Sequence, residues 1–318
     1  MSRQTDVPHG GMPRWADLHC HSRISDGSYS PQGLVRLARA RGLSVLSITD
    51  HDTSPFGAGG SDGAGWQGWD ELREQAAGLD VRLIPGAEIS ARDGKRRIHL
   101  LAYWPEGNTA DSHVEALCSP TRSARDEMTR SHIQTLTGMG LPICVEDVEA
   151  EAQGGNSGLP AAGVAQRDGF TRGFFRVLYK QHIMSVLLQR GLADSMYGEF
   201  YKQHFKGGGP CDRDIDYPDI RSAVAAVVAD GALPVLAHPG LQDSFDLVAE
   251  LAELGLWGIE LNHEAHDERA RHIILGLAKK HDLFLTGGSD YHGEYGGATA
   301  LGDIVAPAAF FSAENPLL

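Results

Sequence analysis

Nine side chains able to bind a divalent metal ion recur at or just past the ends of short apolar runs in this 318-residue chain. Six are imidazoles and three are carboxylates: His19, His21, His51, His99, His238 and His292, with Asp26, Glu88 and Asp290. Imidazole nitrogens and carboxylate oxygens are common ligands of divalent ions. Several such ions bound in one active-site cleft would indicate metal-assisted hydrolysis.

The spacing of these residues predicts that they can meet. His19 and His21 are two apart on an expected strand, so both side chains leave the same face of that strand. His51 and His238 each follow a further expected strand, and the carboxyl ends of parallel strands collect on one rim of an α/β fold, where active sites lie. Each residue could instead cap a helix or satisfy a loop. That alternative is poor for all nine together.

The elements that must position these residues alternate between strand and helix. We expect strands at residues 16–21, 44–50, 81–84, 98–104, 234–237, 257–261 and 283–286, and helices at 31–41, 220–230, 244–254 and 267–280. A long stretch with helical patterning, from about residue 120 to 216, interrupts this order. Repeated β-then-α units predict a mainly parallel sheet with right-handed crossovers, open or closed into a barrel.

Composition limits the classes of function. The net charge of −14 disfavours a DNA-binding face, since phosphate backbones are held mainly by Lys and Arg. No apolar run of eighteen residues indicates a membrane span, and the start of the chain has no apolar signal core. The four cysteines are widely spaced without a CxxC pair, which is typical of reduced thiols. We therefore expect a cytoplasmic protein.

Seven segments resemble, in order, the motifs of the PHP (polymerase and histidinol phosphatase) family. They are Asp17–His21, Ser25–Gly27, Thr49–Asp52, Pro85–Glu88, Ile98–Leu100, Ala237–Gly240 and Gly288–His292. The resemblance implies a distorted (β/α)7 barrel formed by residues 15–119 and 216–318. Residues 120–215 would be an inserted, mainly helical small domain that contributes substrate contacts, and residues 1–14 a flexible leader.

The resemblance also implies two or three divalent ions, usually Mn, Fe or Zn. His19, His21, Glu88 and Asp290 would hold the first ion, Glu88, His99 and His238 the second with Glu88 bridging, and Asp26, His51 and His292 the third. The family more often has a histidine where this chain has Asp26. An oxygen ligand in place of nitrogen favours Mn or Mg over Zn at that position.

The interrupting stretch resembles the insert of bacterial PHP phosphoesterases that act on nucleoside monophosphates and 3′,5′-bisphosphates. Arg122 and Arg125 are three apart, so on a helix both would face one side and could grip phosphate oxygens. Their alternative role is a solvated helix face. His182 matches the histidine of a phosphate-contacting motif of that branch, in which Lys180 could supply charge; its alternative role is packing.

We therefore expect a phosphoric monoester hydrolase acting on small nucleotides, either 5′-AMP or 3′,5′-bisphosphate nucleosides. Clustered ions would neutralise the ester and activate a hydroxide, while Arg122, Arg125 and His182 would stabilise charge on the phosphate. Asp17, Asp50 and Asp52 would orient ligand imidazoles. The same branch includes a 5′-to-3′ exoribonuclease that trims short RNA 5′ ends, which is the main alternative. Histidinol-phosphate phosphatase and a regulatory, non-catalytic PHP module are further alternatives.

Overall fold

The fold is described from a computed structural model that covers residues 15–56, 68–154 and 177–318. The prediction of a flexible leader at 1–14 lies outside these residues.

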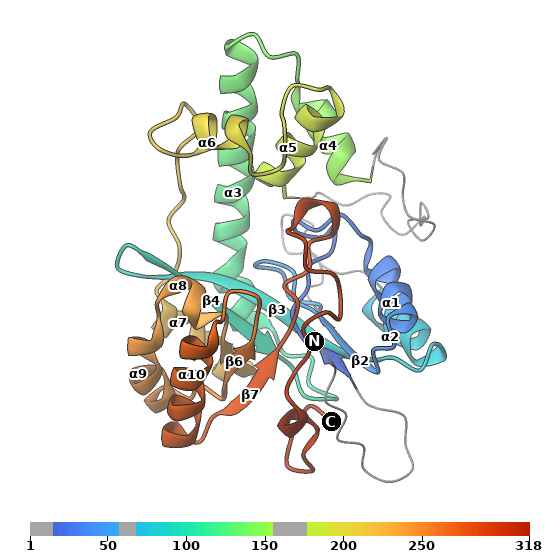
Figure 1. Cartoon of the computed structure of the whole chain (residues 1–318), viewed down its shortest axis with the longest axis vertical. Coiled ribbons are helices and arrows are strands. Elements are labelled where there is room, and N and C mark those ends of the chain that lie inside the picture. Colours follow the sequence, from blue (N-terminus) through green and yellow to red (C-terminus); the bar gives the residue numbers. More distant parts are fainter. Residues whose placement is uncertain (1–14, 57–67, 155–176) are drawn as a thin grey trace.

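Seven strands form one sheet in the order of the chain (Figure 1). They are β1 (Ala16–Asp17), β2 (Val45–Ile48), β3 (Arg82–Asp93), β4 (Arg96–Tyr103), β5 (Leu233–Leu236), β6 (Gly258–Asn262) and β7 (Phe284–Gly287). The first and last strands approach each other, because the Leu18 N–H donates to the Gly287 carbonyl and Cys20 pairs with Tyr291. The sheet is therefore a nearly closed barrel, and the predicted fold class is confirmed.

The fourth strand runs against its neighbours. β1, β2 and β3 are parallel, as are β5, β6 and β7, but β4 is antiparallel to both β3 and β5. A tight hairpin at Asp93–Arg96 reverses the chain, with Gly94 at a φ of 59°, where a side chain would be strained. The hairpin pairs His99 with Ser90, two residues past Glu88. Consequently His99 reaches the same rim as the residues that follow the parallel strands.

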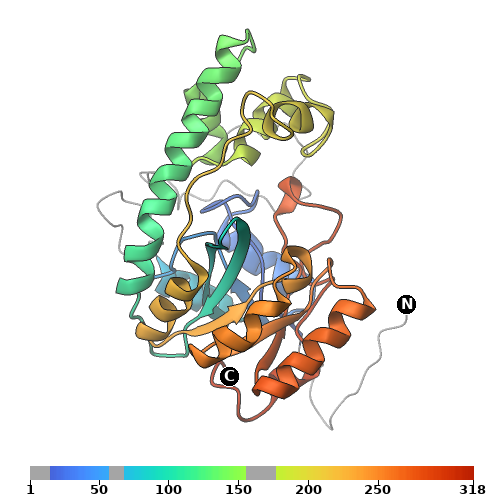
Figure 2. The same ribbon diagram turned by 90° about the vertical axis from the view of Figure 1, so that its left-hand side faces the viewer.

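Helices cover the outside of the barrel (Figures 1 and 2). These are α1 (Pro31–Ala40), α2 (Trp69–Gly78), α7 (Ile220–Ala229), α8 (Pro239–Gln242), α9 (Val248–Glu253) and α10 (Glu268–His281), with short 3-10 turns η2 (Phe245–Leu247), η3 (Gly293–Tyr295) and η4 (Ala308–Phe311). α1 begins as its sequence predicts: Pro31 is its first residue, and the Ser30 side chain accepts a hydrogen bond from the Gly33 N–H. Apolar side chains of β3, β4 and α7 form the largest buried cluster.

The insert rises above one rim of the barrel (Figures 1 and 2). It contains α3 (Ser112–Gly138), α4 (Val145–Ala152), α5 (Lys180–Gln189) and α6 (Glu199–Phe205). α3 serves both parts: Val114 and Cys118 pack in the barrel core, whereas Ile133 and Leu136 pack against α4 and α5. The expected boundary at residue 120 thus falls inside a continuous helix, and the division into domains stays a prediction. Among the described residues, no helix has the length and hydrophobicity of a membrane span.

Candidate metal centre

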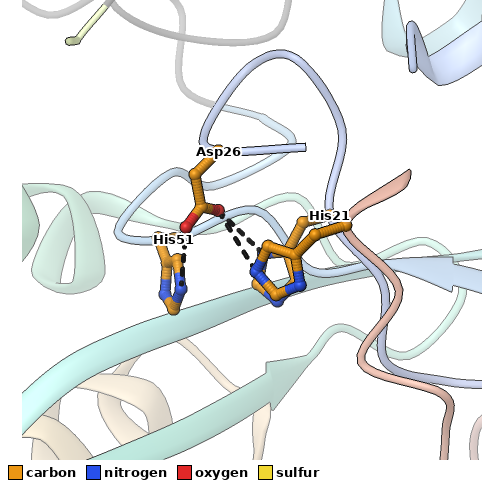
Figure 3. Close-up of side chains that lie close together, drawn as sticks. His21, Asp26 and His51 are labelled. Atoms are coloured by element: carbon orange, nitrogen blue, oxygen red, sulfur yellow. Dashed lines mark ion pairs between the residues drawn. The ribbon is translucent and has the colours of Figure 1, made fainter. Parts of the chain in front are cut away.

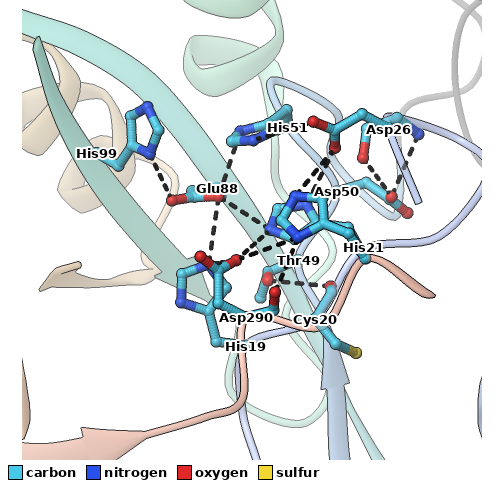
Figure 4. Close-up of polar contacts among 12 residues, drawn as sticks. His19, Cys20, His21, Asp26, Thr49, Asp50, His51, Glu88, His99 and Asp290 are labelled. Atoms are coloured by element: carbon cyan, nitrogen blue, oxygen red, sulfur yellow. Dashed lines mark hydrogen bonds and ion pairs between the residues drawn. The ribbon is translucent and has the colours of Figure 1, made fainter. Parts of the chain in front are cut away.

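The nine predicted side chains converge at one rim of the barrel: Figure 4 shows seven of them, and His238 and His292 contact Glu88 and Asp26, respectively. His19 and His21 follow β1, His51 follows β2, and His238 follows β5. Glu88 lies within β3 and His99 within β4, whereas Asp26 lies in the loop after β1, and Asp290 and His292 follow β7. Nitrogens and oxygens of eight of them fall into three groups in which ligand atoms lie within 4.8 Å of one another. His238 belongs to none of these groups, and the group of Glu88 and His99 contains His51 in place of His238.

The first group contains His19, His21, Glu88 and Asp290. Nε2 of His19 lies 3.2 Å from Glu88 Oε2 and 3.3 Å from Asp290 Oδ1. Nε2 of His21 lies 3.1 Å from each of the same two oxygens. These are the four residues that the family resemblance assigned to one ion.

Glu88 connects this group to a second one. Its Oε1 lies 2.8 Å from His99 Nδ1 and 3.0 Å from His238 Nε2, and its Oε2 lies 3.2 Å from His51 Nδ1. One carboxylate thus contacts histidines of both groups. This is the position that a bridging ligand requires.

The third group surrounds Asp26 (Figure 3). Its carboxylate oxygens lie 3.5 Å from His292 Nε2, 3.7 Å from His21 Nδ1 and 3.8 Å from His51 Nε2. Gln181 of the insert donates a hydrogen bond to Asp26 Oδ2 at 3.0 Å. The group contains the three residues expected for a third ion, with His21 in addition.

Many polar atoms of these three groups have no hydrogen-bond partner within the part of the chain that the structure describes. Several buried site atoms have no hydrogen-bond partner among the described residues: His19 Nε2, both ring nitrogens of His21, His51 Nδ1, His99 Nδ1, Asp26 Oδ1 and Asp290 Oδ1. Buried polar atoms without partners are rare in folded proteins and need an explanation. Divalent ions among these atoms would satisfy them together, so the residues fit a multi-ion centre.

Electrostatics keep the candidate ligand carboxylates ionised but divide the histidines. The carboxylates of Asp290 and Glu88 outweigh burial and raise the pKa of His21 to about 10, and together with Glu260 they hold the pKa of His19 well above its usual range. Burial lowers the pKa of His51 to about 3, so its imidazole is neutral at pH 7. Burial alone would raise the pKa of Glu88, but His99, His51 and His19 outweigh it and hold that pKa well below its usual range. Neutral imidazoles and ionised carboxylates are the forms that coordinate metal, so an ion bound by His19 and His21 would displace protons from them.

A cavity of about 280 Å³ opens above these groups, at the lower end of the range for small-molecule sites. Its floor includes Asp26, Glu88 and Asp290. The insert and the β3–β4 hairpin supply its walls, through Arg97, Arg125, Tyr179, Lys180, Gln181, Tyr201, Lys206 and Tyr217, among others. The candidate metal centre is therefore open to a small ligand.

Comparison with known proteins decides the family. Residues 17–139 match the family model of the PHP domain. The chain is 36% identical over 282 residues to the phosphoribosyl 1,2-cyclic phosphate 1,2-diphosphodiesterase of Eggerthella lenta. The aligned region covers 88% of this chain and 95% of that protein. The chain belongs to the PHP family. Within that family it is a metal-dependent phosphoesterase.

Other PHP proteins extend the likeness. The 3′,5′-nucleoside bisphosphate phosphatase of Chromobacterium violaceum is 28% identical over 87% of this chain and 86% of its own length, and 5′-3′ exoribonucleases also match. A solved structure from Bifidobacterium adolescentis, assigned as a metal-dependent phosphoesterase, superimposes with a TM-score of 0.75 at 27% identity and covers 93% of both chains. The PHP barrel and its insert are thus shared over nearly the whole length.

Two residues of this PHP centre were missed by the sequence analysis. Glu260 in β6 lies with Oε1 3.1 Å from His19 Nδ1, and its Oε2 accepts a hydrogen bond from the His238 N–H. His263 Nε2 lies 3.3 Å from Asp290 Oδ2. An acidic residue inside the apolar run 257–261 was the available signal for Glu260. His263 has no recognisable metal-motif spacing.

The expectation that Asp17, Asp50 and Asp52 orient ligand imidazoles is wrong. Asp17 accepts hydrogen bonds from the Ser289 N–H and hydroxyl and from the Gly302 N–H. Asp50 binds Ser22 and Ser25 in the loop that carries Asp26, and Asp52 binds Ser90 and Arg125. Each of these three carboxylates therefore fixes a loop or strand beside the ligands. The imidazole of His19 is held by a different carboxylate, that of Glu260.

The three predicted substrate-binding residues occupy different environments. Arg125 lines the cavity, where its Nη2 donates to Asp52 Oδ2 at 2.6 Å and to Ser90 Oγ at 3.0 Å and its guanidinium lies over the Tyr179 ring. Arg122 is 1% exposed and donates to Glu115 and to the Asp52 carbonyl. His182 is also 1% exposed, and its Nδ1 accepts from the Tyr179 N–H. The cavity lining thus contains Arg125 but neither Arg122 nor His182.

Proposed function

We propose that this chain hydrolyses phosphate esters of small phosphorylated ribose compounds, with the nine converging side chains as ligands of two or three divalent ions. One observation carries the proposal. Glu88, almost fully buried in the cavity floor, contacts five histidines: His19, His21, His51, His99 and His238. Such an arrangement is unstable without cations and well suited to holding them.

Bound divalent ions would neutralise phosphate oxygens and lower the pKa of water at neutral pH. Side chains of the protein would orient the phosphate group. Arg125 is held by Asp52 and Ser90 on the cavity wall, where its free guanidinium donors can meet phosphate oxygens. Substrate contacts by Arg122 and His182 stay predictions. In the positions described, we propose that Arg122 fixes α3 against Asp52 and that His182 fixes the start of α5.

Among ribose phosphates, we rank a phosphoribosyl cyclic phosphate ahead of the nucleotide monoesters that the sequence suggested. The supporting observation is the 36% identity to the E. lenta diesterase over 95% of its length, against 28% for the bisphosphate phosphatase. Monoester hydrolysis of 3′,5′-bisphosphate nucleosides or 5′-AMP is the second candidate. A cavity of about 280 Å³ favours either small substrate over a nucleic acid strand.

The test is a substrate panel with the manganese-loaded protein. It compares 5-phosphoribosyl 1,2-cyclic phosphate, 3′,5′-bisphosphoadenosine, 5′-AMP and a 5′-phosphorylated oligoribonucleotide. We expect the highest kcat/KM with the cyclic phosphate, complete loss with chelator, and loss in Glu88→Gln, which controls for contaminating phosphatases. Predominant release of mononucleotides from the oligonucleotide would instead support the exoribonuclease alternative. No turnover of any ester would favour the regulatory module. The cytoplasmic location stays a prediction.

A further inference from the structure

The cavity has an acidic floor and a cationic outer wall. Three cations from separate elements line that wall: Arg97 in β4, Lys180 at the start of α5, and Lys206 directly after α6. The insert and the barrel hairpin therefore both contribute positive charge to one side of the cavity. In a chain with a net charge of −14, this local reversal of sign needs a reason.

Neighbouring carboxylates neutralise the wall only in part. Arg97 Nε donates to Asp214 Oδ2 at 2.8 Å, and Asp214 also accepts from the Tyr217 hydroxyl. Lys180 Nζ lies 3.4 Å from a carbonyl, that of Arg213. Within residues 15–56, 68–154 and 177–318, neither Lys180 nor Lys206 forms an ion pair. Asp212 also acts on Lys180, so three cations face two carboxylates and a surplus of one positive charge remains.

The cations are also close enough to repel one another. Burial lowers the pKa of Lys180, and the positive charges of Arg97 and Lys206 lower it further, against the opposing effect of Asp214 and Asp212. A cluster of like charges in a partly closed cavity is unfavourable until an anion enters it. The cluster lines the same cavity as the candidate metal ligands Asp26, Glu88 and Asp290, so one bound substrate can contact both.

We propose that this outer wall, Arg97, Lys180 and Lys206, binds a second phosphate of the substrate, one that the metal centre does not cleave. The inference rests on the proposed function and deepens it: the substrate is a ribose compound with an additional phosphomonoester dianion. Tyr201 and Tyr217 line the same side and supply flat surfaces for the sugar or base between the two phosphates. The named substrates of two relatives each carry two phosphate groups.

The experiment uses pairs of substrates that differ only in the second phosphate. These are ribose 1,2-cyclic phosphate with and without a 5-phosphate, and 3′,5′-bisphosphoadenosine with 3′-AMP. Lys206→Ala and Lys180→Gln are compared with Lys202→Ala, which removes an exposed lysine of α6 outside the cavity. We expect each wall variant to lower kcat/KM for the two-phosphate member about tenfold, mainly through KM, and to change the one-phosphate member less than twofold.

Binding provides a readout that does not depend on turnover. Calorimetric titration with ribose 5-phosphate should give a Kd that Lys206→Ala raises at least fivefold and Lys202→Ala leaves unchanged. Equal losses on both members of each pair, or an unchanged Kd in both wall variants, would overturn the second-phosphate site. If ribose 5-phosphate binds as expected while no ester is hydrolysed, the wall is supported and the proposed function fails.

Discussion

At the scale of single residues, the centre is organised for ligand binding at the expense of local stability. His238 and Asp290 adopt φ values of 24° and 51°, in the left-handed region that residues with side chains seldom occupy. Backbone strain of this kind costs about 1–3 kcal/mol per residue and clusters at functional sites. Both side chains thereby reach Glu88 or its histidines. Such strain indicates selection for geometry.

Glu260 provides a test of that geometry. Its carboxylate holds Nδ1 of His19, so that Nε2 faces Glu88 and Asp290. In Glu260→Gln we expect manganese affinity to fall about 10–100-fold, the usual effect of losing a carboxylate that supports a ligand histidine. Calorimetric titration with manganese measures it, and Glu264→Gln, an exposed neighbour, is the control. Equal affinities in Glu260→Gln and the unaltered protein would refute the assigned role.

The sequence predicted the positions of the candidate metal ligands better than it predicted the carboxylates that orient them. His19, His51 and His238 follow apolar strands, and strand ends are recognisable from local periodicity. The partner of a buried carboxylate depends on which distant elements pack together. Asp17 and Glu260 both lie on strands near His19, yet only Glu260 contacts its ring. No local pattern separates the two.

At the scale of elements, the antiparallel strand shows the same limit. Alternating strands and helices predicted a mainly parallel sheet, and four of the six strand pairings are parallel. The exception is β4, which follows β3 after a Gly94 hairpin without an intervening helix. The Asp93-Gly94 pair is a hairpin signal, but the strands on either side were read as shorter and more separate than they are.

Helix α3 carries a buried histidine, His132, that should make the stability of the protein depend on pH. His132 is fully buried, with its ring edge-on to Phe205, and burial together with Lys180 and Arg213 lowers its pKa to about 4. Because the folded-state pKa lies below the unfolded value of about 6.5, the unfolded chain takes up the proton first. Stability from the neutral imidazole is therefore present above pH 6.5 and is lost as pH falls toward 4.

We expect His132→Leu to remove this pH dependence. Between pH 7 and pH 5, the free energy of unfolding of the unaltered protein should fall by about 2 kcal/mol more than that of the variant. Urea unfolding of the metal-free protein at both pH values measures the difference, and titration of the metal-ligand histidines cancels because both proteins share it. His272→Gln, at an exposed position, should behave like the unaltered protein. Parallel pH curves for His132→Leu and the unaltered protein would contradict the assignment.

At the scale of the whole molecule, the centre joins the two ends of the described chain. His19 follows the first strand and Asp290 the last, and their side chains meet at 3.3 Å where the barrel edges approach. Ions held between them would bind the folded protein and not the unfolded chain. Metal binding should therefore stabilise the entire barrel through mass action.

Manganese titration of stability tests this coupling. At one hundred times its dissociation constant, a single bound ion raises the free energy of unfolding by about 2.7 kcal/mol. We expect the urea midpoint of the unaltered protein to rise accordingly and chelator to reverse the rise. Glu88→Gln should lose most of this stabilisation, because the Glu88 carboxylate contacts histidines of the first group and of the second group of candidate ligands. Glu264→Gln should retain the full effect. An equal rise in Glu88→Gln would mean that manganese stabilises the protein elsewhere, because Glu88 is the carboxylate that belongs to both groups.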